Sequence, residues 1–248
     1  MSASVPSLAV ACVRGNDARD ALRRARLLGL AYAGTDEAVR TDLSLVVESG
    51  ALWIRDNRRR GLRPLRADFQ STETRSRKQP LGRAVGRRTA SVADATAGWG
   101  HDARRLCAMG YAVTAIERNP VVAALLTDAA DRATRAGRAD VPVVVAADSI
   151  EFLGRHCGRF DCVYLDPMFP AGSRPSALTR RPLRLLREMV GDDVDCRDLF
   201  EAARLAAAKR VVIKRLDHAA PLFGRPDEVM EGKLVCYDVY HRRPAPGC

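Results

Sequence analysis

The sequence predicts an α/β protein in which a doubly wound, Rossmann-like parallel sheet follows a small N-terminal α+β lobe. Strand-like and helix-like segments alternate from residue 91 onward. The composition changes near residues 87–90, where a basic stretch ends. Glycines and acidic residues follow several predicted strands, which is where an open parallel sheet binds its ligands. We therefore expect two units, residues 1–88 and residues 89–248.

The first unit contains three short apolar runs and one helix-like segment. Residues 8–13, 43–47 and 51–54 predict strands, and residues 18–30, rich in Ala, Leu and Arg, predict a helix. Residues 55–88 are basic and interrupted by Gly and Pro, so they do not fit a central strand. This stretch is either a solvated linker or a surface that docks a polyanion.

The second unit contains segments typical of buried strands, because they are short, rich in Val, Ile and Ala, and bounded by turn signals. These segments are residues 91–95, 112–117, 141–146, 160–166 and 209–214. Helices are expected at residues 101–109, 120–135, 150–156 and 197–208. Pro120 suits the first turn of its helix, where its missing N–H is not needed, and Asn119 can cap that helix. Residues 229–240 alternate in polarity and predict a strand or hairpin at the sheet edge.

The chain is strongly basic. Its 41 Lys and Arg residues against 30 Asp and Glu residues give a net charge of +11. Arginine, which forks onto phosphate groups, outnumbers lysine. A nucleic-acid partner is one expectation, and a solvated basic surface is the other. Residues 58–60 together with Arg75, Arg77 and Lys78 are where such a partner would dock.

The sequence carries no membrane or export signal and no metal-binding pattern. It has no run of about 18 apolar residues and no leader of the secretory type. We therefore expect no membrane segment and a cytoplasmic location. The seven cysteines are scattered and include no C-x-x-C pair. They are expected to be reduced thiols, and no metal site is expected.

A glycine-containing turn, Asp-Ala-Thr-Ala-Gly-Trp-Gly at residues 94–100, follows a predicted strand and precedes a predicted helix. Gly98 and Gly100 let the backbone approach a cofactor, and the helix start offers free N–H groups to an anionic group. The third glycine of the dinucleotide fingerprint is missing, which disfavours a nicotinamide-dependent oxidoreductase. The alternative is a turn that needs glycine only for its backbone angles.

Two acidic residues follow the next two strands. Glu117 ends one strand, at a spacing from Gly100 that suits one helix and one strand, so it can accept the hydroxyls of a ribose. Asp148 follows the third strand. It can meet an adenine amino group or cap the following helix, and both interpretations stay open.

A third motif, Tyr-Leu-Asp-Pro-Met-Phe-Pro at residues 164–170, ends the fourth strand. An aromatic amine is a poor nucleophile, because its lone pair is delocalised into the ring, so an enzyme that methylates it must align it with the methyl donor. The Asp166 carboxylate and the Pro167 carbonyl can accept the two N–H bonds of the amine and stabilise its developing charge. Phe169 offers a face on which the base can stack.

These motifs resemble those of the RsmJ family of bacterial 16S ribosomal RNA (guanine-N2) methyltransferases. The matching segments are residues 94–100, Glu-Arg-Asn-Pro-Val-Val-Ala-Ala-Leu-Leu at 117–126, residues 164–170 and Lys-Arg-Val-Val-Ile-Lys-Arg at 209–215. The resemblance covers about residues 62–240. It implies a class I methyltransferase fold, S-adenosylmethionine (SAM) as methyl donor, and no metal. The implied substrate is guanine-1516, near the 3′ end of 16S rRNA, in free RNA or in the small ribosomal subunit.

The motifs and the resemblance together assign residues to three roles. The expected cofactor contacts are Asp94, Gly98, Gly100, His101, Asp102, Glu117, Arg118, Asp148, Ser149 and Asp166. The expected catalytic residues are Asp166, Pro167 and Phe169. RNA contacts are expected at Arg75, Arg77, Lys78 and Lys214, although Lys214 equally fits a lysine that extends from a strand end to solvent.

The sequence therefore predicts a SAM-dependent rRNA (guanine-N2) methyltransferase that acts as a monomer. One alternative is a non-catalytic RNA-binding or ribosome assembly factor that keeps the same fold. Another is an adenine-N6 methyltransferase of DNA or RNA, because the loop at residues 164–170 resembles those of amino-methyltransferases in general.

Overall fold

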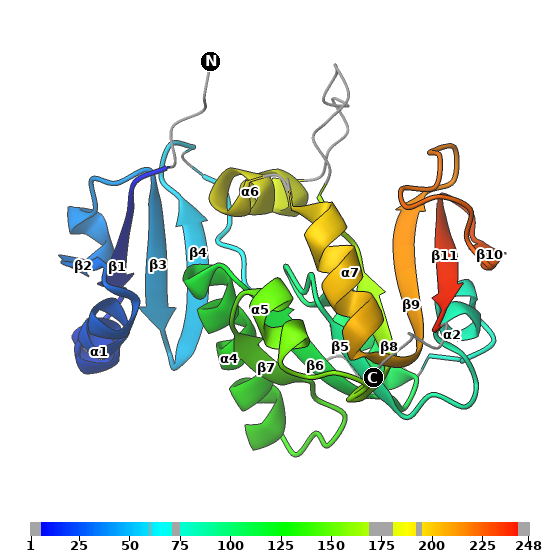
Figure 1. Cartoon of the computed structure of the whole chain (residues 1–248). Coiled ribbons are helices and arrows are strands. Elements are labelled where there is room, and N and C mark those ends of the chain that lie inside the picture. Colours follow the sequence, from blue (N-terminus) through cyan, green and yellow to red (C-terminus); the bar gives the residue numbers. More distant parts are fainter. Residues whose placement is uncertain (1–5, 60, 71–74, 169–180, 192–194, 243–248) are drawn as a thin grey trace.

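The chain folds around two β-sheets, which the computed structural model describes over residues 6–59, 61–70, 75–168, 181–191 and 195–242. A four-stranded sheet in the order β2-β1-β3-β4 forms the N-terminal lobe, and a seven-stranded sheet in the order β10-β11-β9-β8-β5-β6-β7 forms the larger unit. Figure 1 shows the lobe on the left and the larger sheet in the centre and on the right. The predicted α/β class with a small α+β lobe is confirmed.

The N-terminal lobe is a parallel β-α-β unit extended by a hairpin. β1 pairs in parallel with β2 and β3, and β3 pairs antiparallel with β4. Its elements are β1 (Leu8–Cys12), a 3-10 turn (Gly15–Asp17), α1 (Ala18–Leu28), β2 (Ala31–Thr35), a 3-10 turn (Asp36–Ala38), β3 (Leu43–Glu48) and β4 (Ala51–Asp56). β2 does not follow from the sequence pattern, because none of its residues is buried and it forms no apolar run.

The larger sheet is parallel from β7 through β6, β5 and β8 to β9, and β11 runs antiparallel to both β9 and β10. Its strands are β5 (Ser91–Asp94), β6 (Ala112–Glu117), β7 (Val143–Ala146), β8 (Phe160–Leu165), β9 (Ala207–Leu216), β10 (Glu228–Glu231) and β11 (Val235–His241). Its helices are α2 (Pro80–Val85), α3 (His101–Ala108), α4 (Pro120–Arg135), α5 (Ser149–Gly154), α6 (Arg181–Val190) and α7 (Cys196–Ala206). The strands and helices predicted for this unit are confirmed, with most ends shifted by one or two residues.

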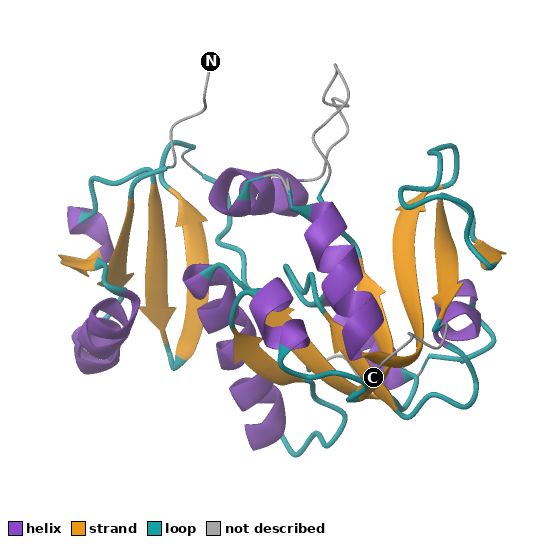
Figure 2. Cartoon of the chain, in the orientation of Figure 1, coloured by secondary structure: helices purple, strands orange, loops and turns teal. Residues whose placement is uncertain are grey.

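Helices cover both faces of the larger sheet (Figure 2). Neighbouring residues of one strand face different cores, as Val92 and Ala93 do on β5 and Cys162 and Val163 do on β8. The first core includes buried residues of α2, α3 and α4, and the second includes those of α5 and α7. Burial on both faces explains why these strands are continuously apolar in sequence.

The lobe and the larger sheet share the first core. Leu52 and Ile54 of the lobe belong to the same buried cluster as Leu126 and Ala129 of α4. Phe69, from the connecting segment, is 1% exposed and packs into the same cluster. The lobe is therefore joined to α4 by apolar packing and not only by the chain.

The start of α4 is fixed as the sequence predicts. The Asn119 side chain accepts hydrogen bonds from the backbone N–H groups of Val121 and Val122, at 3.0 and 3.2 Å. Pro120 occupies the first turn. These contacts satisfy two N–H groups that have no partner inside the helix, so α4 begins directly beside Glu117.

The basic segment before α2 is anchored by Arg77. Its guanidinium donates to the carbonyl oxygens of Met109 and Gly110, at 2.8 and 2.7 Å, and lies 4.0 Å over the centre of the Tyr111 ring. α2 itself packs against β9, β10 and β11. The prediction of Arg77 as a phosphate contact is corrected by this geometry, because its guanidinium joins the segment to the turn before β6. The division at residue 88 stays a prediction.

Candidate active site

A cavity of about 930 Å³ lies at the carboxyl ends of the parallel strands. It adjoins the place between β5 and β8 where the strand order reverses, which is where doubly wound sheets bind ligands. Its lining includes every predicted cofactor residue except Gly100, together with Lys214. The volume lies in the range typical of cofactor pockets. The structure therefore brings together side chains from α3, α5 and the ends of β5, β6, β8 and β9.

The two glycines of the turn have different tasks. Gly98 lines the cavity with a φ of +50°, and a Cβ there would lie 2.9 Å from the Leu186 side chain of α6. Gly100 has a φ of +74°, and its Cβ would lie 2.7 Å from the Phe69 ring and 2.8 Å from Leu126. Gly98 thus permits close approach at the cofactor side. Gly100 is needed for packing between the lobe and the larger sheet, which departs from its predicted cofactor role.

Glu117 is the last residue of β6, and its carboxylate lies against the glycine turn. It is 5% exposed, and its carboxylate accepts the backbone N–H groups of Gly98, at 3.0 Å, and Asn119, at 2.7 Å. Each carboxylate oxygen has a second acceptor position, so these bonds orient the group and still allow it to accept ribose hydroxyls. The neighbouring Arg118 pairs with Asp195 at 2.9 Å across the cavity rim.

Asp148 and Ser149 begin α5. The Asp148 side chain accepts the N–H groups of Ile150 and Glu151, at 2.9 and 3.0 Å, so the helix-cap interpretation is confirmed while the side chain also lines the cavity. The Ser149 hydroxyl donates to the carbonyl oxygen of Ala95 at 2.7 Å. It therefore ties α5 to the glycine turn.

Asp166 follows β8 and opens into the cavity. Its backbone N–H donates to the Thr96 hydroxyl at 2.6 Å, which fixes the segment against the glycine turn. Its side chain is 41% exposed, so a ligand in the cavity can reach it. Pro167, the next residue, is buried. Phe169 lies outside the described residues, and its predicted stacking role stays a prediction.

Three acidic residues and one lysine lie close together in the lining of the cavity. The Lys214 ammonium donates to Asp102 and to Asp166, at 2.7 Å each. Burial, together with the negative charges of Asp102 and Asp166, raises the pKa of Asp94 to about 8. Burial alone would raise the pKa of Asp102, but Lys214 and Tyr164 reverse that effect and lower it overall. Asp94 therefore keeps its proton at neutral pH, whereas Asp102 is ionised.

The sequence pattern alone does not reveal several cavity residues. The Trp99 indole N–H donates to the Pro182 carbonyl oxygen at 2.8 Å, which joins the glycine turn to α6. Leu183, Leu186 and Val190 of α6 cover the apolar side of the cavity. α6 is not among the helices predicted from the sequence, although the apolar residues between 182 and 190 have helical spacing, which is the signal that could have found it.

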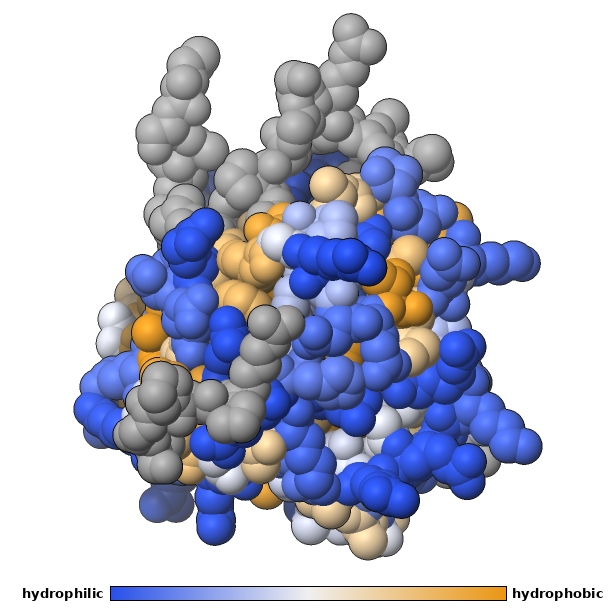
Figure 3. Space-filling view, turned by 45° about the vertical axis from the view of Figure 1, so that its right-hand side comes forward, coloured by the Kyte–Doolittle hydropathy of each residue, from blue (hydrophilic) through white to orange (hydrophobic). Residues whose placement is uncertain are grey.

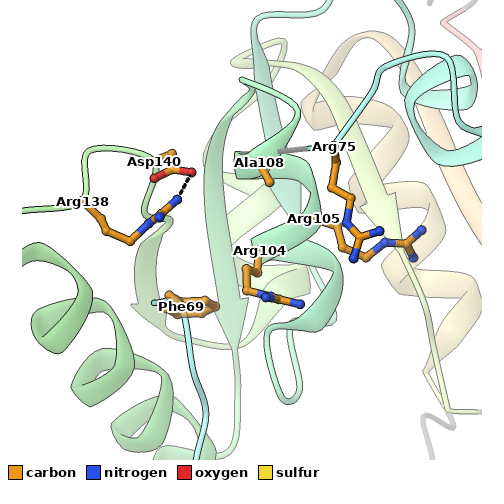
Figure 4. Close-up of a pocket in the computed structure, with 7 residues that line it drawn as sticks. All are labelled: Phe69, Arg75, Arg104, Arg105, Ala108, Arg138 and Asp140. Carbon is orange, nitrogen blue, oxygen red and sulfur yellow. Dashed lines mark hydrogen bonds and ion pairs between the residues drawn. The ribbon is translucent and has the colours of Figure 1, made fainter. Parts of the chain in front are cut away.

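The arginines near the basic segment form a second feature. Arg75, Arg104, Arg105 and Arg138 line a small hollow around Phe69. Figure 4 shows the guanidinium groups of Arg75 and Arg105 side by side and the Arg138–Asp140 ion pair on the opposite side of the view. Arg58, by contrast, pairs with Asp56 and with Glu188 of α6. Lys78 is exposed.

Within the described ranges, no group of three or more His, Cys, Asp or Glu side chains has an arrangement that could hold a metal ion. The cysteines of these ranges are free thiols. None of the described helices is long and apolar enough to cross a membrane.

The fold and the cavity define a SAM-dependent methyltransferase. An antiparallel strand β11 lies between β9 and β10, a glycine turn follows β5, and a buried carboxylate that can accept a ribose follows β6. A protein-family model described as "Putative SAM-dependent methyltransferase" matches residues 30–242. SAM fits this donor set, because Glu117 suits its ribose and the carboxylates around Lys214 suit its cationic sulfonium.

Comparison with individual proteins identifies the family. The chain is 37% identical over 232 residues to ribosomal RNA small subunit methyltransferase J of Thioalkalivibrio sulfidiphilus, covering 86% of this chain and 89% of that protein. It is 35% identical to the Pseudomonas aeruginosa protein of the same name, with 97% of each covered. A crystal structure of a SAM-dependent methyltransferase from Neisseria gonorrhoeae matches with a TM-score of 0.69 and 25% identity, over 97% and 98% of the two chains. The chain belongs to the ribosomal RNA small subunit methyltransferase J family.

Proposed function

We propose that this enzyme transfers the methyl group of SAM to the exocyclic N2 of a guanine in 16S rRNA, at the position equivalent to guanine-1516. The name shared by its relatives supports ribosomal RNA of the small subunit as the substrate. The observation that carries the choice of an amino group is the position of Asp166, which directly follows the carboxyl end of β8 and lines the cavity. Pro167 is the next residue in the chain.

The proposed chemistry depends on alignment. SAM, when bound, supplies an activated methyl group on a sulfonium. The Asp166 carboxylate and the Pro167 carbonyl accept the two N–H bonds of the guanine amine, so that the nitrogen lone pair points at the methyl group. Asp166 also stabilises the positive charge that develops on the nitrogen. The nitrogen then releases one proton to water, and no strong general base is needed.

The cofactor is held from three sides in this proposal. Glu117 accepts the ribose hydroxyls, and the backbone at Gly98 approaches the cofactor closely. His101, Asp102, Arg118, Asp148 and Ser149 complete the cofactor contacts from the neighbouring cavity wall. Asp94, which keeps its proton, lines the same cavity as the Asp102 and Asp166 carboxylates and is available as a hydrogen-bond donor.

The proposed RNA-docking surface combines Arg75 and Lys78 with Arg104, from the first turns of α3. Arg75 and Arg104 line the same hollow (Figure 4), and α3 begins at the cavity. The face drawn in Figure 3 is mostly hydrophilic, with its apolar residues in small separate patches. We propose that the enzyme works as a monomer in the cytoplasm, where bacterial ribosomes are found.

The test is to incubate the enzyme and SAM with small-subunit rRNA from a strain that lacks the gene. Mass spectrometry of the nucleosides should detect N2-methylguanosine, and mapping should place it at one guanine near the 3′ end. The Asp166→Ala variant should give none. N6-methyladenosine as the product would contradict the proposal. Specific RNA binding without any methylated nucleoside would favour the assembly-factor alternative.

A further inference from the structure

Lys214 joins two carboxylates that come from different parts of the fold. It lies on β9, Asp102 lies in the first turn of α3, and Asp166 follows β8. The ammonium nitrogen is 2.7 Å from an oxygen of each carboxylate. The Lys214 side chain is 21% exposed and that of Asp102 is 11% exposed. The Lys214–Asp102 pair is therefore largely shielded from water, so its attraction is screened less than that of a surface pair. The Asp166 side chain is 41% exposed and faces the cavity.

Asp102 is itself fixed by three donors. The Tyr164 hydroxyl donates to the same oxygen that Lys214 contacts, at 2.7 Å, and Arg105 donates to the other oxygen at 3.0 Å. Tyr164 is fully buried in β8, two residues before Asp166. Asp102 therefore holds the Lys214 ammonium in one position, and the ammonium in turn holds the Asp166 carboxylate through its second hydrogen bond.

We propose that Lys214 is a positioning residue for methyl transfer, which holds the Asp166 carboxylate in the orientation that receives the target amine. This inference rests on the proposed role of Asp166. Catalysis by alignment requires that side chain to be held within a fraction of an ångström, and a chain segment that ends a strand does not achieve this alone. The ammonium also offsets the repulsion between the Asp102 and Asp166 carboxylates.

This role differs from contact with an RNA phosphate, the other interpretation of Lys214. A lysine whose charge is already balanced by two carboxylates attracts a phosphate only weakly. The charged and titratable groups that act on this site are Asp94 of β5, His101, Asp102 and Arg105 of α3, Tyr164 of β8, Asp166 and Tyr237 of β11. Asp102 and Asp166 hold the Lys214 ammonium within the protein, so its position does not depend on an RNA phosphate.

The test compares Lys214→Met and Lys214→Arg with the wild-type enzyme, using SAM and unmethylated 16S rRNA. Lys214→Met should lower the single-turnover rate at saturating substrates by about 100-fold, the loss expected for a misplaced reacting group. RNA affinity and its salt dependence should stay within about twofold, since no phosphate contact is removed. Lys214→Arg should recover part of the rate, because the charge and the two-carboxylate contact are kept.

The pH–rate profile provides a readout that a purely structural role would not move. Without the cation, the two carboxylates repel each other and one of them takes up a proton more readily. The acid side of the profile of Lys214→Met should therefore move to higher pH. Asp166→Asn should remove most of the effect of Lys214→Met in the double variant, because Lys214 acts through Asp166.

Lys209→Met is the matched control. Lys209 lies on the same strand and also forms an ion pair, with Asp161 at 2.8 Å, but at the opposite end of β9. Its loss should change stability and leave the single-turnover rate unchanged. A wild-type rate and pH profile for Lys214→Met would overturn the inference, as would a loss confined to RNA affinity with a flatter salt dependence. If Asp166→Asn alone keeps full activity, the proposed role of Asp166 fails first.

Discussion

At the scale of single residues, Asp166 is the side chain on which the proposed reaction depends most directly. Replacing it with Ala should lower the single-turnover rate about 100-fold or more, because the amine loses its aligning acceptor. The protein should stay folded, since this side chain is 41% exposed and does not build the core. Rapid-quench measurement at saturating SAM and RNA checks this. Asp161→Asn, at the start of β8 and so at the opposite end of that strand from Asp166, should keep the rate.

Glu117 should act mainly on cofactor affinity. Glu117→Ala removes the charged hydrogen bonds that we propose to the ribose, each contributing about 1.5–3 kcal/mol, so calorimetry should record SAM affinity weaker by about 10- to 100-fold. The change also leaves the N–H groups of Gly98 and Asn119 without this acceptor, so thermal stability should fall as well. Glu151→Ala, an exposed acid on α5, serves as the control. Unchanged SAM affinity in Glu117→Ala would exclude the ribose contact.

Asp94 should make stability depend on pH. Its pKa is raised to about 8 by burial first and by its acidic neighbours second, whereas an unfolded aspartate titrates near pH 4. Between these values the folded chain binds a proton that the unfolded chain does not, so this group's contribution to stability is full below about pH 4 and is lost as pH rises towards 8. Asp94→Asn should therefore lose less stability than the wild type between pH 5 and pH 8. The melting temperatures of both proteins are measured without SAM across this pH range. An equal decrease in melting temperature with pH for the two proteins would contradict the prediction.

At the scale of elements, Arg77 shows that one side chain can fix a whole segment. Arg77→Ala removes hydrogen bonds to four carbonyl oxygens, two of them short and two at 3.4 Å, and a contact with the Tyr111 ring. We expect a loss of about 2 kcal/mol, which lowers the melting temperature by about 4–8 °C in a chain of this size. Lys78→Ala, one residue away and exposed, should change it little. Equal effects of the two changes would contradict the anchoring role.

α6 links the lobe to the cofactor cavity. Glu188 of α6 pairs with Arg58 at 2.6 Å, and the Met189 carbonyl oxygen accepts the Asn119 side-chain amide at 2.9 Å. Figure 1 shows α6 between the lobe and α7. Since α6 covers the apolar side of the cavity, the lobe contributes to the cofactor site through this helix.

At the scale of the whole molecule, the net charge of +11 should make RNA binding depend on salt. Each phosphate that the protein neutralises releases counterions, so RNA affinity should fall steeply as salt rises, while SAM affinity should hardly change. Reversing Arg75 and Lys78 to Glu should weaken RNA binding and reduce the salt slope by about 1 to 2. Filter binding across a salt series measures both.

The control for that prediction keeps the same change in net charge. Arg135 and Arg155 are exposed arginines on α4 and just after α5, and reversing both should leave most of the slope in place. If the two double reversals reduce RNA affinity and its salt slope equally, net charge and not a docking surface governs RNA binding. Arg77 is left out of the reversal, because its replacement would disturb the fold.

Local sequence patterns were enough to predict the doubly wound sheet, the glycine turn, the position of Glu117 and the loop at Asp166. These features are local: strand and helix periodicity, a cap such as Asn119, and an acid at a strand end are all visible within a few residues. Strand ends of a parallel sheet gather at one edge. The grouping of the cofactor residues around one cavity therefore followed from the pattern.

The partners of several of these residues depend on how distant segments pack together. Lys214 and Asp102 are 112 residues apart in the chain and meet at 2.7 Å, and Gly100 is needed because Phe69 of another segment packs against it. Arg77 resembles its basic neighbours in sequence, but its guanidinium donates hydrogen bonds to the carbonyl oxygens of Met109 and Gly110. A charged side chain takes its role from the partners and burial that folding brings to it, and those depend on long-range packing that no local pattern contains.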